Sequence, residues 1–452
     1  MFLELDKKPP EKTAAKDDLG NQVTYGELIR EKERVAGLVP RRSLVFLLCR
    51  NDVASLKAYI GTVLSGSVPL LLDTNVQEPL LERLLDVYRP QFIYRDGEFQ
   101  ATGEPAYELY EDLELLLPTS GSTGSPKLVR YGKGNLDVSA RNTARAYGWT
   151  AEERPLCDLP MHYTMGLNVI NMHLYVGATL LLMTRRVTHG LFWQFALDER
   201  ATSFTGVPFS YEVFFKLKVD RMELPDLKTF CEGGGRLSEE TFRRLVELTT
   251  AQGKRFVASF GTTETSSRIA LLPPQEAATH ILSIGKAIPG GELALYDGEE
   301  ELLEPAATGE LVFRGPVVTL GYAATKADLA AGDVFRGEFR TGDIARRDAD
   351  GFYYIIGRRS RFLKLLGHRV DLNECEELIK KEFGCDAACA GDDNQMRIYV
   401  TDPAGAEQAE IREADVRNFI SRLTGVNASK FAVSRIAAIP RNSYGKIIYA
   451  EL

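Results

Sequence analysis

The sequence contains few cysteines for its length, and they follow no pairing motif. Six cysteines occur in 452 residues, and no two of them have the spacing of a Cys-x-x-Cys motif. Disulfide frameworks are typical of short secreted chains that are much denser in cysteine. We therefore expect free thiols that are mostly buried. The six are Cys49, Cys157, Cys231, Cys375, Cys385 and Cys389.

Long hydrophobic runs and basic tracts are also missing. Apolar stretches such as VGATLLLM at residues 176–183 are far too short to span a bilayer. The amino terminus has no basic segment followed by an apolar run, so we expect no signal peptide, no membrane insertion and a cytoplasmic protein. The net charge of -8 and the lack of a basic tract argue against nucleic acid as a partner.

The sequence instead shows a regular alternation of strand and helix patterns. Thr24, with Glu27 three positions later, predicts a capping box at the start of an amphipathic helix. Apolar strand patterns at 43–49 and after Gly66 alternate with helical spacing, which predicts a parallel sheet covered by helices. Short alternating strands between 285 and 322 predict a small antiparallel sheet or barrel. The length and the hydrophobic content of 44% predict more than one domain.

One stretch, residues 115–136, has the composition of an anion-binding loop between regular elements. Three leucines lead into Pro118, and nine residues then provide hydroxyls, glycines and one lysine before apolar spacing returns. Glycines let the backbone turn sharply and bring N–H groups close to an anion, while the hydroxyls and the lysine add further donors. We expect a polyphosphate ligand here. The candidate contacts are Thr119, Ser120, Gly121, Ser122, Thr123, Gly124 and Lys127.

This loop is not a P-loop of the Walker type. Pro126 stands where that motif needs its second glycine, and Leu128 follows the lysine where the motif needs serine or threonine. The simpler alternative is a solvated linker, because tracts rich in serine and glycine usually are linkers. The short length of the tract, the lysine and the buried-strand pattern before it favour a phosphate loop.

The stretch also resembles a known family. Residues 119–127, TSGSTGSPK, are similar to the phosphate-binding loop of the adenylate-forming (AMP-binding) superfamily, which includes acyl- and aryl-CoA synthetases, peptide synthetase adenylation domains and luciferases. Further motifs of this family follow in order: FGTTE at 260–264, RTGD at 340–343, GRR at 357–359 and PRNSYGK at 440–446. The resemblance therefore covers nearly the whole chain.

The resemblance implies an α/β fold with two domains. Residues 1–358 would form a large N-terminal domain of doubly wound, helix-covered sheets with a small β-barrel-like part. Residues 359–452 would form a small, mobile α+β C-terminal domain. The composition changes to charged helices and short strands after this boundary, in agreement with the division. Ser360 would be the hinge, at a position where the family usually has aspartate or lysine.

The resemblance also assigns contacts to the nucleotide. Phe260 would offer its ring face to adenine, Asp343 would accept hydrogen bonds from both ribose hydroxyls, and Arg358 would approach the ribose and the phosphates. The three glycines at 233–235 would lie against the base and the acyl chain. Without the family, they predict a strand-to-helix turn that needs positive φ. The remaining assigned contacts are Gly233, Gly234, Gly235, Gly261, Thr262 and Thr263.

Five residues receive catalytic roles from the resemblance: Thr119, Lys127, His162, Glu264 and Lys446. Glu264 would bind Mg²⁺ together with the phosphates of ATP, and Lys446 would bridge the substrate carboxylate and the α-phosphate. A lone histidine such as His162 is more often structural, but the resemblance places it in the acyl pocket beside the thiol tunnel. The pocket and tunnel would comprise His162, Gly166, Val207, Gly234, Gly285, Gly367 and Arg369.

The implied reaction converts a carboxylic acid and ATP to acyl-AMP and pyrophosphate, and then forms a thioester with CoA. No acidic residue follows Pro160 in PMHYTMGLNV, where relatives that activate amino acids carry an aspartate, so we expect an uncharged acyl or aryl acid. The phosphopantetheine of an acyl carrier protein is an alternative acceptor. A nucleotide-binding sensor without catalysis is an alternative of another class. The joint presence of Glu264, Asp343 and Lys446 argues against it.

Overall fold

The structure is a computed structural model of the 452-residue chain. It describes residues 1–118, 127–358, 361–365, 368–392, 394–403, 411–442 and 447–452. Two compact units make up the chain. The first comprises Met1–Ala294, Val312–Arg340 and Asp350–Tyr354, and the second comprises Leu295–Leu311, Thr341–Ala349 and Ile355–Leu452. The boundary predicted after Arg358 stays a prediction.

The first unit contains a nine-stranded sheet with the order β15-β14-β13-β12-β11-β9-β10-β1-β2. Neighbouring strands from β13 to β1 are parallel, while β2 at one edge and β14 and β15 at the other are antiparallel. The strands are β1 (Thr13–Asp17), β2 (Gln22–Thr24), β9 (Pro155–Cys157), β10 (Leu180–Leu182), β11 (Ser203–Gly206), β12 (Thr229–Glu232), β13 (Arg255–Phe260), β14 (Ala270–Leu272) and β15 (Lys286–Ala287).

A second sheet has seven strands in the order β19-β8-β7-β4-β3-β5-β6. Its central strands β5, β3, β4 and β7 are parallel, and β6, β8 and β19 pair antiparallel with their neighbours. The strands are β3 (Leu44–Cys49), β4 (Val68–Asp73), β5 (Phe92–Arg95), β6 (Glu98–Ala101), β7 (Leu113–Pro118), β8 (Leu128–Gly132) and β19 (Tyr322–Ala323).

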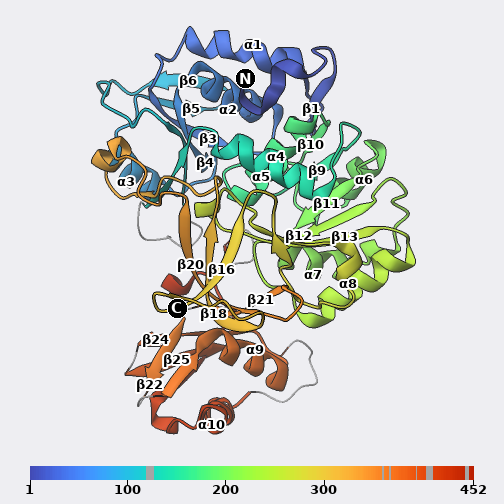
Figure 1. The fold of residues 1–452 in the computed structure, drawn as a ribbon, viewed down its shortest axis with the longest axis vertical. Helices are drawn as coiled ribbons and strands as arrows, with labels where there is room; N and C mark the ends of the chain where they lie inside the picture. Colours follow the sequence, from blue (N-terminus) through green and yellow to red (C-terminus); the bar gives the residue numbers. More distant parts are fainter. Residues whose placement is uncertain (119–126, 359–360, 366–367, 393, 404–410, 443–446) are drawn as a thin grey trace. The chain divides into compact units, whose positions relative to one another are not determined.

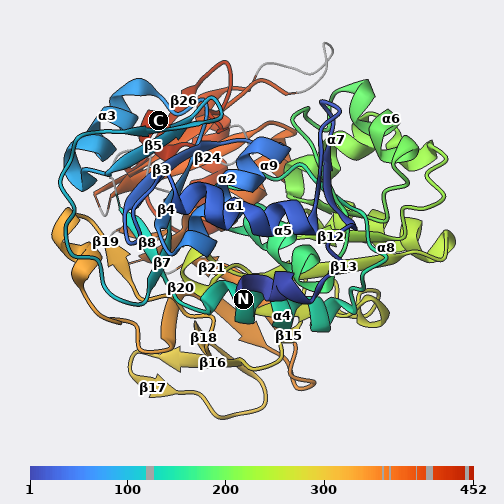
Figure 2. The same cartoon turned by 90° about the horizontal axis from the view of Figure 1, so that it is seen from above.

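Helices separate and cover the two sheets. The largest buried cluster joins α1, α2, α4 and α5 with apolar residues of both sheets, so these helices form a layer between them (Figure 2). A second cluster packs α6, α7 and α8 on the outer face of the nine-stranded sheet, and a third packs α3 on the outer face of the seven-stranded sheet. The helices are α1 (Tyr25–Ala36), α2 (Val53–Ser65), α3 (Glu78–Tyr88), α4 (Asn135–Tyr147), α5 (Thr164–Val176), α6 (Gly190–Asp198), α7 (Pro208–Lys216) and α8 (Glu239–Ala251).

Local sequence signals account for the ends of several helices. Thr24 Oγ1 accepts the Glu27 N–H, and Glu27 Oε2 accepts the Thr24 N–H, which is the predicted capping box of α1. Helix α2 ends at Gly66, whose φ of 80° places it in the left-handed region that favours glycine. Ser238 accepts the N–H of Thr241 at the start of α8.

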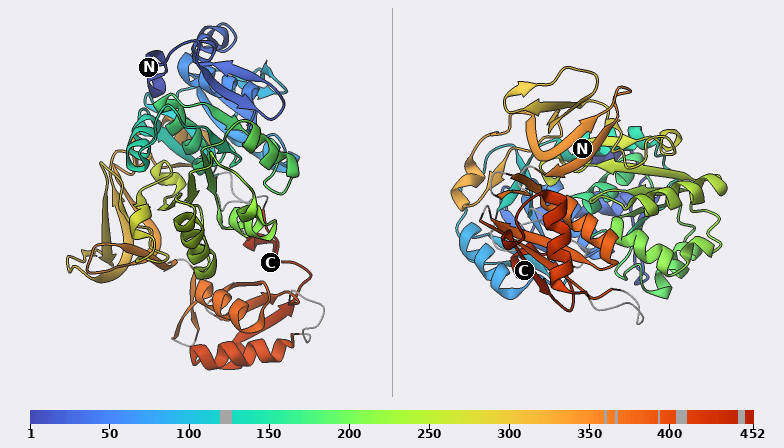
Figure 3. Two further views of the ribbon diagram at one scale, coloured as in Figure 1. Left: turned by 90° about the vertical axis from the view of Figure 1, so that its right-hand side faces the viewer. Right: turned by 90° about the horizontal axis from the view of Figure 1, so that it is seen from below.

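A five-stranded sheet has the order β17-β16-β18-β20-β21. Three of its strands, β16, β17 and β18, lie in the range 285–322 that was predicted to form a small sheet or barrel, whereas β15 and β19 of that range pair with the two large sheets. The second unit contains a β22-β23 pair and a β24-β25-β26 sheet, and α9 and α10 share one buried cluster with these strands (Figures 1 and 3). The predicted α/β fold with an α+β part is confirmed. These elements are β16 (Glu292–Asp297), β17 (Glu300–Glu301), β18 (Ala307–Arg314), β20 (Glu338–Arg347), β21 (Tyr353–Arg358), β22 (Phe362–Leu365), β23 (His368–Asp371), α9 (Leu372–Phe383), β24 (Ala387–Asp392), β25 (Gln395–Val400), α10 (Glu413–Thr424) and β26 (Phe431–Arg435).

All six cysteines are free and buried, as predicted. Burial raises the pKa of the Cys231 thiol to about 12, and it raises the pKa of the Cys49 thiol still further. These thiols are therefore neutral and unreactive at physiological pH. In the part of the chain that the structure describes, no helix has the length and apolar character needed to cross a bilayer.

The buried His173 on α5 should make the fold sensitive to acid. Burial lowers the pKa of His173 to about 3, and its Nδ1 lies 2.8 Å from the Val169 carbonyl oxygen. Because the unfolded chain binds a proton on this side chain below about pH 6.5 and the folded chain does not, the free energy of unfolding should fall by about 1.4 kcal/mol per pH unit below that pH. Above about pH 6.5, His173 should cause no loss of the free energy of unfolding.

Thermal unfolding at pH 7 and pH 5 measures this effect. His173→Gln should show a smaller drop of the melting temperature between the two pH values than the wild type, although its stability at pH 7 should be lower. His189→Gln, at an exposed histidine, serves as the control and should behave like the wild type. An equal drop in the wild type and in His173→Gln would contradict the assignment.

Candidate functional site

The predicted phosphate loop connects two paired strands of the seven-stranded sheet. Strand β7 ends at Pro118, β8 begins at Leu128, and these two residues face each other in an antiparallel register. Strands on both sides of the loop agree with the sequence prediction. Residues 119–126 lie outside the described residues. Lys127, the last residue of the predicted loop, is described and precedes β8 directly.

Lys127 and Glu264 are linked through one aromatic ring. Tyr322 on β19 pairs with Val129 on β8, which places its ring beside the end of the loop. The Nζ atom of Lys127 lies 3.5 Å from the centre of this ring, and the Tyr322 hydroxyl donates a 2.7 Å hydrogen bond to Oε1 of Glu264. Tyr322 therefore holds the Lys127 ammonium with its ring and the Glu264 carboxylate with its hydroxyl, so the two charged groups have a defined position relative to each other.

Glu264 lies in a tight turn that passes directly over Gly261. A Cβ atom on Gly261 would lie 1.3 Å from the carbonyl oxygen of Ser267, so only glycine fits there. Ser266 and Ser267 both have positive φ, at 52° and 96°, although neither is glycine. Such strained conformations persist only where the surrounding structure enforces them, and they are concentrated at functional sites.

Hydrogen bonds hold this turn against β8. The buried hydroxyl of Tyr131 donates to the Thr263 carbonyl oxygen at 2.8 Å and lies 3.0 Å from Oγ1 of Thr164, the first residue of α5. The Glu264 carbonyl oxygen accepts the N–H of Thr319 at 2.9 Å. The FGTTE segment is therefore tied by its backbone to the strand that follows the phosphate loop.

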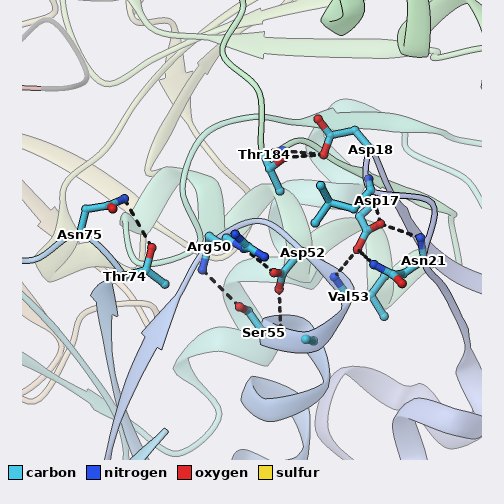
Figure 4. A network of polar contacts seen from close by, with 12 residues as sticks. Asp17, Asp18, Asn21, Arg50, Asp52, Val53, Ser55, Thr74, Asn75 and Thr184 are labelled. Carbon is cyan, nitrogen blue, oxygen red and sulfur yellow. Dashed lines mark hydrogen bonds and ion pairs between the residues drawn. The ribbon is translucent and has the colours of Figure 1, made fainter. Parts of the chain in front are cut away.

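Polar contacts also join the carboxyl ends of strands from the two large sheets (Figure 4). Asp17, the last residue of β1, accepts the N–H of Val53 at the start of α2 at 3.1 Å. Asp52 caps the same helix by accepting the N–H of Ser55 at 2.8 Å. Asp18 accepts the N–H of Thr184 after β10 at 3.0 Å. Strand ends from both sheets are therefore held at one edge, where ligands of α/β folds bind.

His162 lies near residues at the carboxyl ends of β3 and β4. The amide nitrogen of Asn51 donates to the carbonyl oxygens of Cys157 and Leu159, and its amide oxygen accepts the N–H of Met161. His162 Nε2 lies 3.7 Å from Oδ2 of Asp73, the last residue of β4. Burial lowers the pKa of His162, and the nearby Asp73 carboxylate opposes this shift. The imidazole is therefore mainly neutral at pH 7.

The three-glycine loop after β12 adjoins a small apolar cluster. A Cβ atom on Gly233 would lie 3.1 Å from Sδ of Met165, and one on Gly234 would lie 3.1 Å from the hydroxyl of Tyr163 and 3.3 Å from Val207. Leu159, Met165, Val207 and Tyr163 form one apolar cluster. This surface suits an acyl or aryl group, and it contains Val207, one of the predicted pocket residues.

Two other predicted pocket residues have clear structural reasons to be glycine. A Cβ atom on Gly166 would lie 2.2 Å from the Pro160 carbonyl oxygen, so a side chain would prevent the first turn of α5 from packing. A Cβ atom on Gly285 would lie 1.8 Å from the carbonyl oxygen of Leu271 on β14. Their roles in an acyl pocket stay predictions.

The two residues predicted to contact the ribose form an ion pair within the second unit. Arg358 Nε donates to Oδ1 of Asp343 at 2.7 Å, and the Asp343 N–H is bonded to Oγ1 of Thr341. The Asp343 carboxyl is almost fully buried, whereas Arg358 is more than half exposed. The ion pair fixes the orientation of the Asp343 carboxylate, and the predicted contact of both residues with a ribose stays a prediction.

Several predicted site residues cannot be placed. Ser360, Gly367 and Lys446 lie outside the described residues, as does the loop at 119–126, and the side chain of Arg369 is not described. Their roles stay predictions.

Two tyrosines that connect the motifs were not predicted from the sequence. Tyr322 links Lys127 to Glu264, and Tyr131 links β8 to Thr263, but neither stands in a motif of its own. Asp73 could have been predicted as a site residue, because it is a carboxylate at the carboxyl end of the buried strand VPLLLD.

A comparison with protein-family models matches residues 4–323 to the AMP-binding enzyme model. The match covers well over half of the chain. The chain belongs to the AMP-binding enzyme family. The predicted membership of the adenylate-forming superfamily is confirmed.

Curated relatives carry ligase names. The chain is 27% identical over 383 residues to the 2-succinylbenzoate--CoA ligase of Listeria monocytogenes, a match that covers 80% of this chain and 78% of the relative. It is 28% identical over 358 residues to the long-chain-fatty-acid--CoA ligase of Escherichia coli O157:H7, covering 76% of this chain and 61% of that protein.

Solved structures share the fold. O-succinylbenzoate Coenzyme A Synthetase (MenE) from Bacillus subtilis, in complex with AMP, matches with a TM-score of 0.81 at 22% identity, and the match covers 100% of this chain and 97% of that chain. ATP-bound MatB from Rhodopseudomonas palustris matches with a TM-score of 0.78 at 23% identity and covers 100% and 98%.

Glu264 fits the Mg²⁺ site that the family implies. Mg²⁺ prefers oxygen ligands and commonly binds through one or two carboxylates together with substrate phosphates and waters. Glu264 supplies one carboxylate, which is partly exposed and oriented through Oε1 by the Tyr322 hydroxyl. It stands close to Lys127 at the end of the predicted phosphate loop, linked through the same tyrosine.

Removing only the Tyr322 hydroxyl should weaken metal binding in the AMP-binding enzyme. Tyr322→Phe keeps the ring beneath Lys127 but deletes the hydrogen bond that orients the Glu264 carboxylate. Loss of such a supporting contact should raise the Mg²⁺ concentration that half-saturates ATP binding by about 10-fold.

Calorimetric titration of ATP at a series of Mg²⁺ concentrations measures this change. Tyr94→Phe also removes one phenol hydroxyl, which there bonds the Ala54 carbonyl, and it should leave the Mg²⁺ dependence unchanged. An unchanged Mg²⁺ dependence in Tyr322→Phe would show that the hydroxyl does not position the metal ligand.

Proposed function

We propose that the protein is an acid–thiol ligase that activates a carboxylic acid with ATP and then transfers the acyl group to CoA. In the first step, a carboxylate oxygen attacks the α-phosphorus, the bond to the β-phosphate oxygen breaks, and pyrophosphate leaves with acyl-AMP as the product. In the second step, a thiol attacks the acyl carbonyl, loses its proton, and displaces AMP. Family membership and the ligase names of the relatives support this proposal.

The linkage from Lys127 through Tyr322 to Glu264 carries the proposal. The first step brings an anionic nucleophile to an anionic phosphate, so the protein must supply positive charge and positioning. Lys127 supplies a cation at the end of the predicted phosphate loop, and Glu264 supplies a metal ligand held by the same tyrosine. A bound Mg²⁺ would neutralise phosphate charge. Such an arrangement suits a polyphosphate with its bound metal ion.

Residues 119–126 and Lys127 would hold the β- and γ-phosphates, with Thr119 at the start of the loop. Gly261 and Thr262 in the turn after Phe260 would face the nucleotide, with the Phe260 ring against adenine. Asp343 and Arg358 would hold the ribose. Lys446 would act on the charge that develops between the substrate carboxylate and the α-phosphate.

The acid would bind between His162 and the three-glycine loop. The neutral imidazole can donate or accept a hydrogen bond without adding charge. The apolar cluster with Met165, Tyr163 and Val207 would bury the acyl or aryl group. In the segment after Pro160, no acidic side chain is present to bind the ammonium group of an amino acid.

CoA is the proposed acceptor, because the curated relatives are named as CoA ligases. Gly367 and Arg369 are proposed to reach the thiol tunnel after Ser360 changes its backbone conformation. The phosphopantetheine of a carrier protein remains the alternative thiol. We also propose the cytoplasm as the site of this reaction, since ATP and CoA are available there.

Replacement of Lys446 should separate nucleotide binding from catalysis. Lys446→Ala should lower acid-dependent exchange of pyrophosphate into ATP by about 100-fold or more, because the lysine is proposed to stabilise charge in the transition state. ATP affinity, measured by calorimetry, should change little. Glu264→Gln should instead raise the Mg²⁺ requirement.

Lys381→Ala, at an exposed lysine of the same unit, is the matched control and should exchange at the wild-type rate. If Lys446→Ala also kept most of that rate, the assigned role of Lys446 would be wrong. If ATP bound but no acid supported exchange in the wild type, the sensor alternative would be favoured.

A substitution at Gly367 should affect only the second step. Gly367→Leu should block the conversion of chemically synthesised acyl-AMP to a thioester, because a bulky side chain would obstruct the proposed tunnel. Pyrophosphate exchange should continue at the wild-type rate. Both half-reactions are measured separately on the same preparation, with CoA and with a phosphopantetheinyl carrier as acceptors. Equal loss of both would indicate that this loop has a structural role only.

A further inference from the structure

One buried hydroxyl joins the start of α5 to the turn that carries Glu264. Tyr131 on β8 is fully buried, and its ring belongs to the core cluster between the two large sheets. Its hydroxyl donates a 2.8 Å hydrogen bond to the Thr263 carbonyl oxygen and lies 3.0 Å from Oγ1 of Thr164. Thr263 directly precedes Glu264, and Thr164 is the first residue of α5. The two partners of Tyr131 therefore belong to different parts of the proposed site.

The direction of these hydrogen bonds follows from the number of protons. A phenol has one proton and a carbonyl oxygen can only accept, so the Tyr131 proton lies in the bond to Thr263. The Thr164 hydroxyl must then donate to the Tyr131 oxygen. Burial raises the pKa of Tyr131 above its usual range, so the phenol keeps its proton at physiological pH. The bonds therefore run in one direction, from Thr164 through Tyr131 to Thr263, and each strengthens the next.

On the acid side, Thr164 belongs to a tightly packed segment. Its two neighbours, Tyr163 and Met165, are members of the apolar cluster beside the three-glycine loop. The Tyr163 N–H donates to the Pro160 carbonyl oxygen at 2.9 Å. A Cβ atom on Gly166 would lie 2.2 Å from the same oxygen, so the first turn of α5 packs directly on this segment. A displacement of Thr164 would therefore displace the apolar cluster with it.

On the metal side, Thr263 belongs to an equally constrained turn. The Glu264 carbonyl oxygen accepts the Thr319 N–H at 2.9 Å, and the Glu264 carboxylate accepts the Tyr322 hydroxyl at 2.7 Å. Tyr131 holds the carbonyl group of the residue before Glu264. A displacement of Thr263 would therefore move the carboxylate that is proposed to bind Mg²⁺.

From this geometry we propose that Tyr131 is a positioning residue that couples the acid pocket to the metal site. This inference rests on the proposed ligase function. An acid that orders the first turn of α5 would favour, through the Tyr131 hydroxyl, the position of Thr263 in which Glu264 binds Mg²⁺ with the nucleotide. Bound metal would favour the ordered pocket in return, because coupling between two sites is reciprocal. The metal site would thus be most stable when the acid is present.

Equilibrium binding measures this coupling without catalysis. The probe nucleotide is α,β-methylene ATP with Mg²⁺, which cannot release pyrophosphate, and the acid is the one that best supports pyrophosphate exchange in the wild type. The coupling factor is the dissociation constant of the acid alone divided by its value with the nucleotide bound. It should be about 10-fold smaller in Tyr131→Phe than in the wild type, and the affinity of each ligand alone should change little. Direct repulsion between the two anions is common to both proteins.

Magnesium dependence distinguishes this role from a purely structural one. The link reaches the nucleotide through the carboxylate of Glu264, which is the proposed metal ligand. The difference in coupling factor between Tyr131→Phe and the wild type should therefore vanish when the nucleotide is titrated in EDTA. A difference of the same size without the metal would contradict the proposal.

Two further variants assign the effect to this link. Thr164→Val removes the other hydroxyl and should lower the coupling factor equally, and its combination with Tyr131→Phe should lower the factor no further. Tyr59→Phe is the matched control. The Tyr59 hydroxyl is also buried and bonds Asn171 on α5 at 3.2 Å, but among the described residues it has no bond to the metal turn. This variant should keep the wild-type coupling factor.

Tyr131→Phe should fold, because its ring keeps its packing and Ser139 still holds Ser266 by a 2.6 Å hydrogen bond. If it does not fold, Thr164→Val, at a partly exposed side chain, decides. An unchanged coupling factor in the variant that folds, or an equal decrease in Tyr59→Phe, would overturn the proposal, while pyrophosphate exchange would still support the ligase function. Absence of exchange with every acid would contradict the ligase function, and the coupling with it.

Discussion

The turn from Gly261 to Arg268 is the constraint on which the site depends. The Ser267 carbonyl oxygen occupies the space of a side chain at position 261, and two consecutive serines adopt positive φ to bring the chain back beside β13. The cost of this conformation is offset by hydrogen bonds to Tyr131 on β8, to Thr319 and to Ser139 on α4. One turn thereby positions Glu264, the carboxylate proposed to bind Mg²⁺, near Lys127 through the shared Tyr322 ring.

The central helix layer explains why residues so distant in sequence meet. Helices α1, α2, α4 and α5 pack against both large sheets in one core, so strand ends from the two sheets approach at a common edge. Polar side chains at those ends then bond across the sheets. Asp17 reaches the start of α2, and Asn51 holds the segment that leads to His162. The apolar core gives the stability, and the polar ends give the site its geometry.

The acyl pocket proposed here has an apolar surface beside one neutral polar group. Met165, Val207 and Tyr163 would favour a hydrophobic group of suitable size, but burial of a methylene group discriminates only weakly between substrates. The neutral imidazole of His162 would add a hydrogen-bonding group to the same pocket without adding charge.

The family, the alternation of strands and helices, the free cysteines and the capping box at Thr24 were all predictable from the amino-acid sequence, because they depend on local residue patterns or on contiguous motifs. The sequence also indicated which motifs would carry the nucleotide. Contacts between motifs needed the tertiary structure. Tyr322 lies 195 positions after Lys127, so no local pattern shows that its ring lies beneath that ammonium. In the sequence, Arg268 is only a charged residue before an apolar strand. The tertiary structure buries it and bonds it to Asn168 and Ser259, because burial and hydrogen bonding arise from long-range contacts.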